Sequence, residues 1–171
     1  AYDPALRRKM LAAAEAKNGK IKPDDLVTIS ERAWREGGAG TEGSFSGFEL
    51  NSRVKLSDIE KGMSIQSGND ASKAVAEHLA GSEETFVKWM NEKAKELKMT
   101  NTHFRNSTGL NEASYPNPPK GEGKHVMSAR DAANLARRLL LDFPEVKEII
   151  AKPRVGTRAF LDITRLTQNG R

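Results

Sequence analysis

The sequence has no cysteine among its 171 residues, which excludes disulfides and leaves the redox compartment unreadable. No apolar run approaches the roughly 20 residues of a membrane span, so we expect no membrane segment. Aromatic residues make up only 6% of the chain, and the longest basic run is Arg7-Arg8-Lys9. Nucleic-acid binding requires a basic stripe or a stacking platform, so we expect no nucleic-acid partner.

Charged residues account for 30% of the chain, hydrophobic residues for 37%, and the mean hydropathy is -0.64. The net charge is +5, but acidic and basic residues are interspersed, which is typical of a solvated mixed surface. The length suits one domain. We therefore expect a single helix-rich domain over residues 1–171, a monomer, with a long turn-rich loop at residues 111–125. The chain begins with Ala1 and shows no signal peptide, so we expect a mature product, a trimmed chain or a fragment.

Several polar residues have the spacing of helix caps. Asp3-Pro4 predicts a helix that ends at Asn18-Gly19. The pattern Ser57-x-x-Glu60 is a capping box and predicts a helix start. Ser82 and Ser128 are expected to cap two further helices, and a short helix is expected at residues 145–151.

Apolar residues at helical spacing predict three buried faces, and short strands are expected at residues 26–29 and 48–54. Residues 37–47 are rich in glycine and serine and predict a loop, while the tail at 154–167 suits a hairpin or extended segment. The three faces comprise Ala71, Ala74, Val75, His78 and Leu79; Phe86, Met90, Ala94 and Leu97; and Ala132, Leu135, Ala136, Leu139 and Leu140.

Ser67-Gly68-Asn69 is a Ser-x-Asn triplet that opens directly into an expected helix. Alone it is ordinary turn chemistry. The surrounding run, residues 61–72, resembles the second active-site motif of the low-molecular-mass penicillin-binding proteins, the serine-type D-alanyl-D-alanine carboxypeptidases. Enzymes of this class use three motifs: Ser-x-x-Lys, Ser-x-Asn and Lys-Thr-Gly.

The resemblance extends along most of the chain, in order. Residues 3–10 match the start of the family motif Asp-Pro-Ala-Ser-Leu-Thr-Lys-Met, and residues 19–29, 97–110 and 128–131 are also similar to the family. The resemblance implies a mainly α fold with a few short strands (α+β), namely the helical subdomain of the penicillin-binding/β-lactamase-like fold without its central sheet.

Two departures bear on catalysis. The family's nucleophilic serine stands three residues before the lysine, but here that position is Leu6, and Lys9 follows in register. Leucine has no hydroxyl and cannot form an acyl-enzyme. No Lys-Thr-Gly occurs within the 171 residues. We therefore expect this chain to be catalytically inactive.

For the residues that match, the resemblance implies roles in acyl-enzyme chemistry. Lys9 would be the base, Ser67 would help to transfer the proton, and Asn69 would bind the substrate amide. The ancestral substrate would be a D-Ala-D-Ala peptide or a β-lactam. The ancestral function would be the trimming of peptidoglycan stem peptides in the periplasm or cell envelope.

The same residues also have simpler, purely structural interpretations. Lys9 can be a solvated helix lysine, and Ser67 and Asn69 can be turn and helix-cap residues. Ser67 as a substitute nucleophile is a further alternative. His78, His103 and His125 do not have the spacing of metal ligands, so we expect no metal and no cofactor.

Three hypotheses follow for the whole chain. The first is an inactive, engineered fragment, suggested by a charged first helix and by Ser72 and Lys73, interpreted as surface redesign. The second is a natural inactive relative that binds cell-wall peptide or a protein partner. The third is a split enzyme whose sheet and nucleophile come from another chain, which predicts a large exposed apolar patch.

Overall fold

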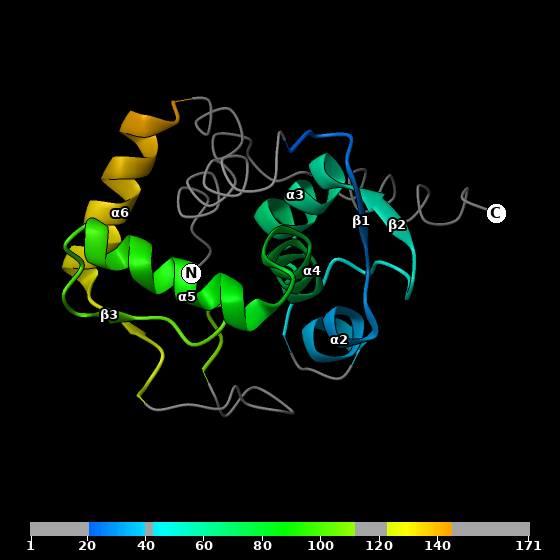
Figure 1. The fold of residues 1–171 in the computed structure, drawn as a ribbon, viewed down its shortest axis with the longest axis horizontal. Coiled ribbons are helices and arrows are strands. Elements are labelled where there is room, and N and C mark those ends of the chain that lie inside the picture. The colour runs from blue at the N-terminus through cyan, green and yellow to red at the C-terminus, as the bar shows by residue number, and fades with distance from the viewer. Residues whose placement is uncertain (1–20, 40–42, 112–122, 145–171) are drawn as a thin grey trace.

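The computed structural model describes residues 21–39, 43–111 and 123–144, which form mainly helices with two small antiparallel sheets (Figure 1). The expectation of a mainly helical chain with a few short strands is confirmed. The helices expected at 3–18 and 145–151, and the tail at 154–167, lie outside the described residues. Within the described ranges, no helix has both the length and the apolar character to cross a membrane.

The first sheet pairs β1 (Leu26–Thr28) with β2 (Arg53–Lys55), and Val27 lies opposite Val54 with both side chains buried. The strand expected at 26–29 is confirmed. The strand expected at 48–54 is misplaced, because a turn with a left-handed residue at Asn51 (φ 61°) precedes the strand, which starts only at Arg53. The second sheet pairs β3 (Thr102–His103) with β4 (Val126–Met127).

The helix α3 (Leu56–Ile65) follows β2 directly, and the capping box expected at Ser57 is wrong. Lys55 occupies the N-cap position without a side-chain cap. The first helical N–H groups find partners elsewhere, since Leu56 donates to the Asp25 carbonyl (2.8 Å) and Ser57 to the Pro23 carbonyl (2.9 Å). Backbone carbonyls from the segment just before β1 therefore replace the side-chain cap.

The helix α4 (Asn69–Ala80) lies between α3 and α5 and also contacts α2, so it is buried on several sides (Figure 1). The expected inward positions are buried except His78, which is exposed although the next residue, Leu79, is part of the core. The helix ends at Gly81, which has a left-handed backbone (φ 77°). Burial also extends beyond the apolar face, to Ser72, Lys73 and Ala76.

The expected serine caps of α5 (Glu83–Glu96) and α6 (Ala129–Asp142) are confirmed. Ser82 and Ser128 each accept a hydrogen bond from the backbone N–H three residues later, both at 3.2 Å. These caps satisfy helical N–H groups that have no partner within the helix.

The apolar faces of α5 and α6 are narrower than the spacing predicts. On α5, Phe86, Met90 and Ala94 are buried and Leu97 is half-buried. On α6, Leu135 and Leu139 are buried, Ala132 and Leu140 are half-buried, and Ala136 is exposed, so the expected inward placement of Ala136 is wrong. Leu135 and Leu139 are four residues apart, so the buried part of this apolar face is a single row of side chains along the helix.

The prediction of a loop over residues 37–47 is wrong for its first residues, which are helical. After α2 (Glu31–Trp34), the chain continues in a π-helical turn, η1 (Arg35–Ala39), and irregular backbone follows at residues 43–49. Gly37 lies so close to the first turn of α4 that an added Cβ would be 2.5 Å from the Asp70 Cα. The glycine is therefore required by the contact between η1 and α4.

Candidate active site

Ser67 stands in the short connection between α3 and α4 with a left-handed backbone, φ 56°. This region is unfavourable for a residue with a side chain and is found at turns and functional sites. The turn is held by the Gly68 N–H, which donates to the Gly62 carbonyl at 3.1 Å. The Ser67 side chain lies on the exposed side of this turn.

Asn69 is the first residue of α4, and its side chain does not serve as a helix cap. The N-cap position is Gly68, and it carries no side-chain cap bond. The alternative that Asn69 is a capping residue is therefore wrong. Its backbone N–H donates to the Ser44 carbonyl at 2.9 Å, and the residue is 6% exposed. Among the described residues, the Asn69 carboxamide makes no hydrogen bond.

The loop at residues 44–47 is fastened over the first turn of α4 by the Asp70 carboxylate. The N–H groups of Ser46 and Gly47 donate to its two oxygens at 2.8 and 3.2 Å. Burial raises the pKa of Asp70, although these backbone donors favour its charged form. Gly68 permits the close approach, because an added Cβ would lie 1.9 Å from the Ser46 Oγ.

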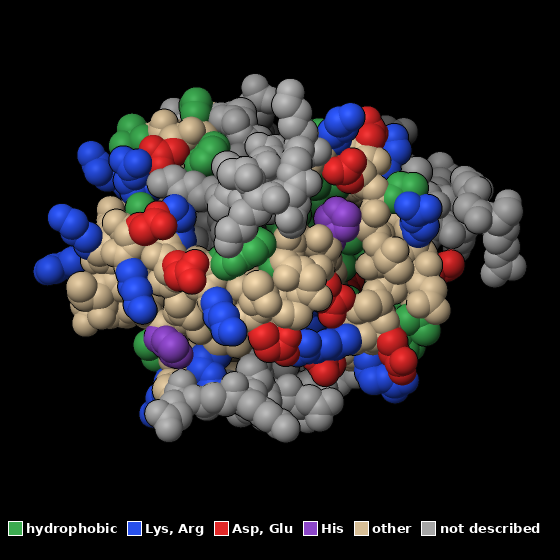
Figure 2. All heavy atoms as spheres, in the orientation of Figure 1, with side chains coloured by type: hydrophobic (Ala, Val, Ile, Leu, Met, Phe, Trp, Pro, Cys, Tyr) green, Lys and Arg blue, Asp and Glu red, His purple; other side chains and the backbone are tan. Residues whose placement is uncertain are grey.

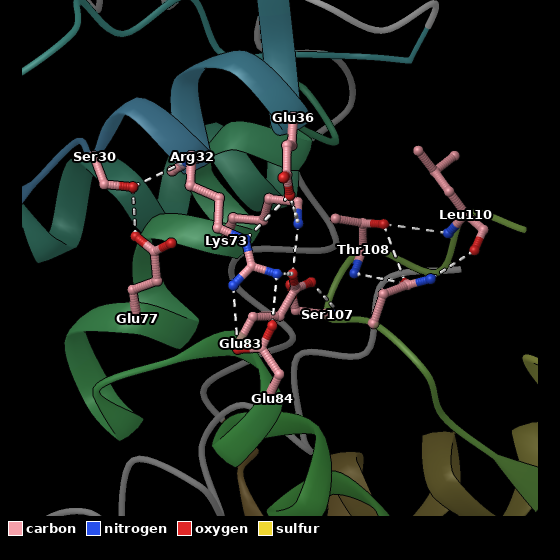
Figure 3. A network of polar contacts seen from close by, with 12 residues as sticks. Ser30, Arg32, Glu36, Lys73, Glu77, Glu83, Glu84, Ser107, Thr108 and Leu110 are labelled. Carbon is pink, nitrogen blue, oxygen red and sulfur yellow. Dashed lines mark hydrogen bonds and ion pairs between the residues drawn. The ribbon is translucent and has the colours of Figure 1, made fainter. Parts of the chain in front are cut away.

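One turn after Asn69, the Lys73 ammonium is enclosed by two carboxylates, as Figure 3 shows. Its Nζ lies 2.5 Å from an oxygen of Glu83 and 3.1 Å from an oxygen of Glu36, and Lys73 is 1% exposed. Ser72 is also buried and donates from its hydroxyl to the Gly68 carbonyl at 3.1 Å. The interpretation of Ser72 and Lys73 as surface redesign is therefore wrong.

Glu83 joins Lys73 to a distant segment. Its second oxygen accepts hydrogen bonds from the backbone N–H (3.0 Å) and the hydroxyl (2.8 Å) of Ser107 (Figure 3). The turn that follows is shaped by Asn106, which is fully buried and whose side-chain oxygen accepts from the N–H groups of Thr108 and Gly109. The network therefore anchors residues 106–109 to α4 and α5.

Arg32 extends the network to the surface. Its guanidinium donates to Glu84 with two nitrogens, at 3.1 and 2.7 Å, and to Glu36 at 3.1 Å. The Glu84 bond raises the pKa of Arg32 and lowers that of Glu84. Burial alone would raise the pKa of Glu36, but the bonds from Lys73 and Arg32 outweigh it and hold this pKa below its ordinary value.

The structure thus brings Ser67 and Asn69 together at one end of α4, whereas Leu6 and Lys9 lie outside the described residues. Sequence reasoning missed the network around Lys73. Lys73 stands beside the apolar face of α4, in a run of small residues from Ala71 to Ala76. This composition was the available signal, because small residues allow neighbouring elements to approach on several sides, and a lysine covered in this way requires a partner.

The three histidines lie on three different segments. His78 is on α4, His103 on β3, and His125 accepts the Arg105 N–H at 3.1 Å. Over the described ranges, no group of three potential metal-binding side chains occurs.

The sequence model of the D-alanyl-D-alanine carboxypeptidase family matches residues 6–170. D-alanyl-D-alanine carboxypeptidase DacF of Bacillus subtilis is 46% identical over 77% of this chain and 30% of its own length. D-alanyl-D-alanine carboxypeptidase DacA of Escherichia coli is 35% identical over 98% of this chain and 40% of its own length. The chain therefore spans about a third of the length of these relatives.

Solved structures share the fold. A peptidoglycan synthesis regulatory factor of Streptococcus pneumoniae superposes with a TM-score of 0.74 at 31% identity, over 87% of this chain and 42% of that one. Penicillin binding protein 5 of Haemophilus influenzae gives 0.65 at 33% identity, over 85% and 40%. The expected penicillin-binding fold is thus confirmed, and this chain belongs to the D-alanyl-D-alanine carboxypeptidase family.

Proposed function

We propose that this chain binds ligands ending in D-Ala-D-Ala, and β-lactams, at Ser67 and Asn69 without acyl transfer. The supporting observation is the Asn69 carboxamide, which stands at the start of α4 and neither caps the helix nor bonds to any described residue. A carboxamide that no described residue uses offers both a donor and an acceptor to a ligand amide. The strained backbone of Ser67 at the same helix end agrees with a functional site.

The absence of acyl transfer is argued from position 6. The family motif has its nucleophilic serine there, and leucine offers no atom for attack on a carbonyl. Lys9 as a base then has no hydroxyl to activate. Ser67 is a poor substitute, because in the described part of the chain no basic side chain hydrogen-bonds to its hydroxyl. Lys73, the lysine one turn into α4, is instead paired with Glu36 and Glu83.

The proposed role is recognition of peptidoglycan stem peptides in the cell envelope or periplasm, by a natural inactive family relative. An engineered fragment with neither activity nor affinity is the competing hypothesis. One of the two arguments for an engineered fragment no longer holds, because Ser72 and Lys73 are buried and do not lie on the surface. The other argument, the charged first helix, concerns residues outside the described ranges.

The experiment is a calorimetric titration with diacetyl-L-Lys-D-Ala-D-Ala, compared with the same peptide ending in L-Ala-L-Ala. We expect binding of the D,D-peptide only, and no release of D-alanine. Asn69→Leu removes the carboxamide and should weaken binding about tenfold, the effect of one well-placed hydrogen bond. Asn134→Leu, which removes a carboxamide on α6, should leave the affinity unchanged. Equal or absent binding of the two peptides would overturn the proposal and favour the engineered fragment.

A further inference from the structure

Charge is distributed unevenly between the two halves of the described chain. Residues 21–39 and 43–85 contain seven basic and eleven acidic side chains, whereas residues 86–111 and 123–144 contain nine basic and four acidic ones. The second half comprises most of α5, the sheet of β3 and β4, and α6. A mixed surface is the ordinary arrangement, and a field of one sign is typical of proteins that attract an oppositely charged partner.

The acidic residues of the second half do little to balance its surface charge. Asp131 is 4% exposed and accepts hydrogen bonds from residues 101 and 102. Two further carboxylates are neutralised by neighbours, in the pairs Lys93–Glu96 and Arg138–Asp142. Glu92 is exposed. The surface of this half is therefore left strongly basic.

The exposed cations of this half form no ion pair with another residue of the described ranges. They are Lys88, Lys95, Lys98, Lys124, Arg130 and Arg137. Arg130 and Arg137 are seven residues apart, about two turns, so they lie on the same outer face of α6.

The end of α5 lies beside α6, because the Asn134 carboxamide donates to the Leu97 carbonyl at 3.0 Å. Figure 2 shows Lys and Arg side chains gathered along the edge of the molecule where Figure 1 places α6 and the end of α5. This basic face comprises Lys95, Lys98, Arg130 and Arg137.

A second copy of this chain is a poor partner for the basic face. Several exposed carboxylates of the other half are already engaged there, in the pairs Asp24–Lys55, Glu31–Arg35 and Glu84–Arg32. The arginines of another copy would have to compete with these pairs. The charge distribution therefore favours an external polyanion.

An anionic lipid surface is also less well matched. Helices that lie on membranes present several large apolar side chains to the bilayer beside their basic ones. In the described ranges of α5 and α6, Leu141 is the one large hydrophobic residue that is exposed. The basic face therefore fits a hydrated polyanion better than a bilayer.

We infer that the basic face binds polymeric peptidoglycan through its carboxylates. The inference rests on the proposed function for the choice of partner, and deepens it. A peptide that ends in D-Ala-D-Ala has a free carboxylate, which is ionised at neutral pH, so a polymer that displays many such peptides is a polyanion. The basic face holds the chain on this polymer and raises the local concentration of peptide ends around Asn69.

The test measures how much of the whole chain sediments with purified peptidoglycan sacculi, at low and at physiological salt. Retention should fall with salt, which screens exposed charges beyond about 8 Å at physiological ionic strength. Arg130→Gln/Arg137→Gln should weaken retention about tenfold at low salt, the lower end of the range for electrostatic focusing. Sacculi whose carboxylates have been blocked with glycinamide should retain little of the unmodified chain.

Lys22→Gln/Arg53→Gln is the matched control, because it removes the same charge from two exposed residues outside the basic face and should change retention little. Equal retention of the two double variants, or full retention on blocked sacculi, would overturn the role of the basic face. Tighter retention on phosphatidylglycerol vesicles than on sacculi would overturn the choice of partner and assign a lipid surface.

Titration with the soluble D-Ala-D-Ala peptide separates this inference from the proposed function. Arg130→Gln/Arg137→Gln should bind the single peptide as tightly as the unmodified chain does, and weaker binding would contradict a separate surface. If the soluble peptide does not bind but retention on sacculi still depends on the two arginines, the proposed function fails and the basic face stands.

Discussion

Lys73 on α4 and Glu83 at the start of α5 form a buried ion pair whose Nζ and Oε2 atoms lie 2.5 Å apart. Their side chains are 1% and 3% exposed. The two helices are therefore joined by charge as well as by apolar packing. Since Glu83 also anchors Ser107, and Lys73 also contacts Glu36, four separate segments depend on this pair.

The first prediction concerns Lys73→Met. Removal of the ammonium leaves Glu83 and Glu36 close to one another without their shared cation, so the free energy of unfolding should fall by about 3 to 5 kcal/mol. Urea unfolding followed by circular dichroism measures this directly. The double variant Lys73→Met/Glu83→Gln should lose less stability than the sum of the two single variants.

Lys93→Met is the matched control for this prediction. Lys93 pairs with Glu96 at the surface of α5, and exposed pairs contribute at most about 1 kcal/mol. If the losses for Lys73→Met and Lys93→Met were equal, the claim that Lys73 holds the four segments together would be wrong.

The second prediction concerns pH. The pKa of Glu36 is held below its ordinary value of 4.5 by Lys73 and Arg32, so the folded chain binds fewer protons here than the unfolded chain. The stability from Glu36 is therefore fully present above pH 4.5 and is lost as the pH falls through the lower folded value. Glu36→Gln should flatten the decline in melting temperature below that pH, as seen by calorimetry from neutral to acidic pH.

Glu31→Gln provides the comparison, because Glu31 pairs with Arg35 where both side chains are largely exposed. Its acid profile should follow that of the unmodified chain. A Glu36→Gln profile parallel to the unmodified one would contradict the assigned coupling.

The third prediction tests the contact between η1 and α4. Gly37→Ala would place a Cβ 2.5 Å from backbone atoms of Asp70, so it should destabilise the chain by about 1 to 3 kcal/mol and weaken peptide binding at Asn69. For Gly38→Ala the nearest atom to the added Cβ is the Phe45 Cβ at 3.4 Å, so this variant should be neutral or stabilising, since alanine favours helix. Thermal melts and the peptide titration together check this, and equal behaviour of the two variants would disprove the role of Gly37.

Local features of the fold could be predicted from the sequence. The caps at Ser82 and Ser128 depend on a side chain and an N–H three residues apart, so the pattern alone identifies them. The capping box at Ser57 failed because backbone from Pro23 and Asp25 satisfies the same N–H groups, and a single window of sequence does not show such partners.

The site was predictable only in part. The Ser-x-Asn triplet is recognisable from the neighbouring sequence, but the contacts that hold it in place are not. Lys73 is buried because Glu36 and Glu83, 37 residues before it and 10 after it, converge on its ammonium. The position of the loop at residues 44–47 likewise depends on hydrogen bonds to α4, 24 residues later. Both are long-range contacts without a sequence period.

The central claim is that this family member forms no acyl-enzyme, and intact-mass spectrometry after incubation with a large excess of benzylpenicillin tests it most directly. An unchanged mass is the predicted result, because leucine at position 6 has no hydroxyl. A mass increased by one penicilloyl group would contradict the claim. Peptide mapping would then show which serine reacted, with Ser67 as the first site to examine.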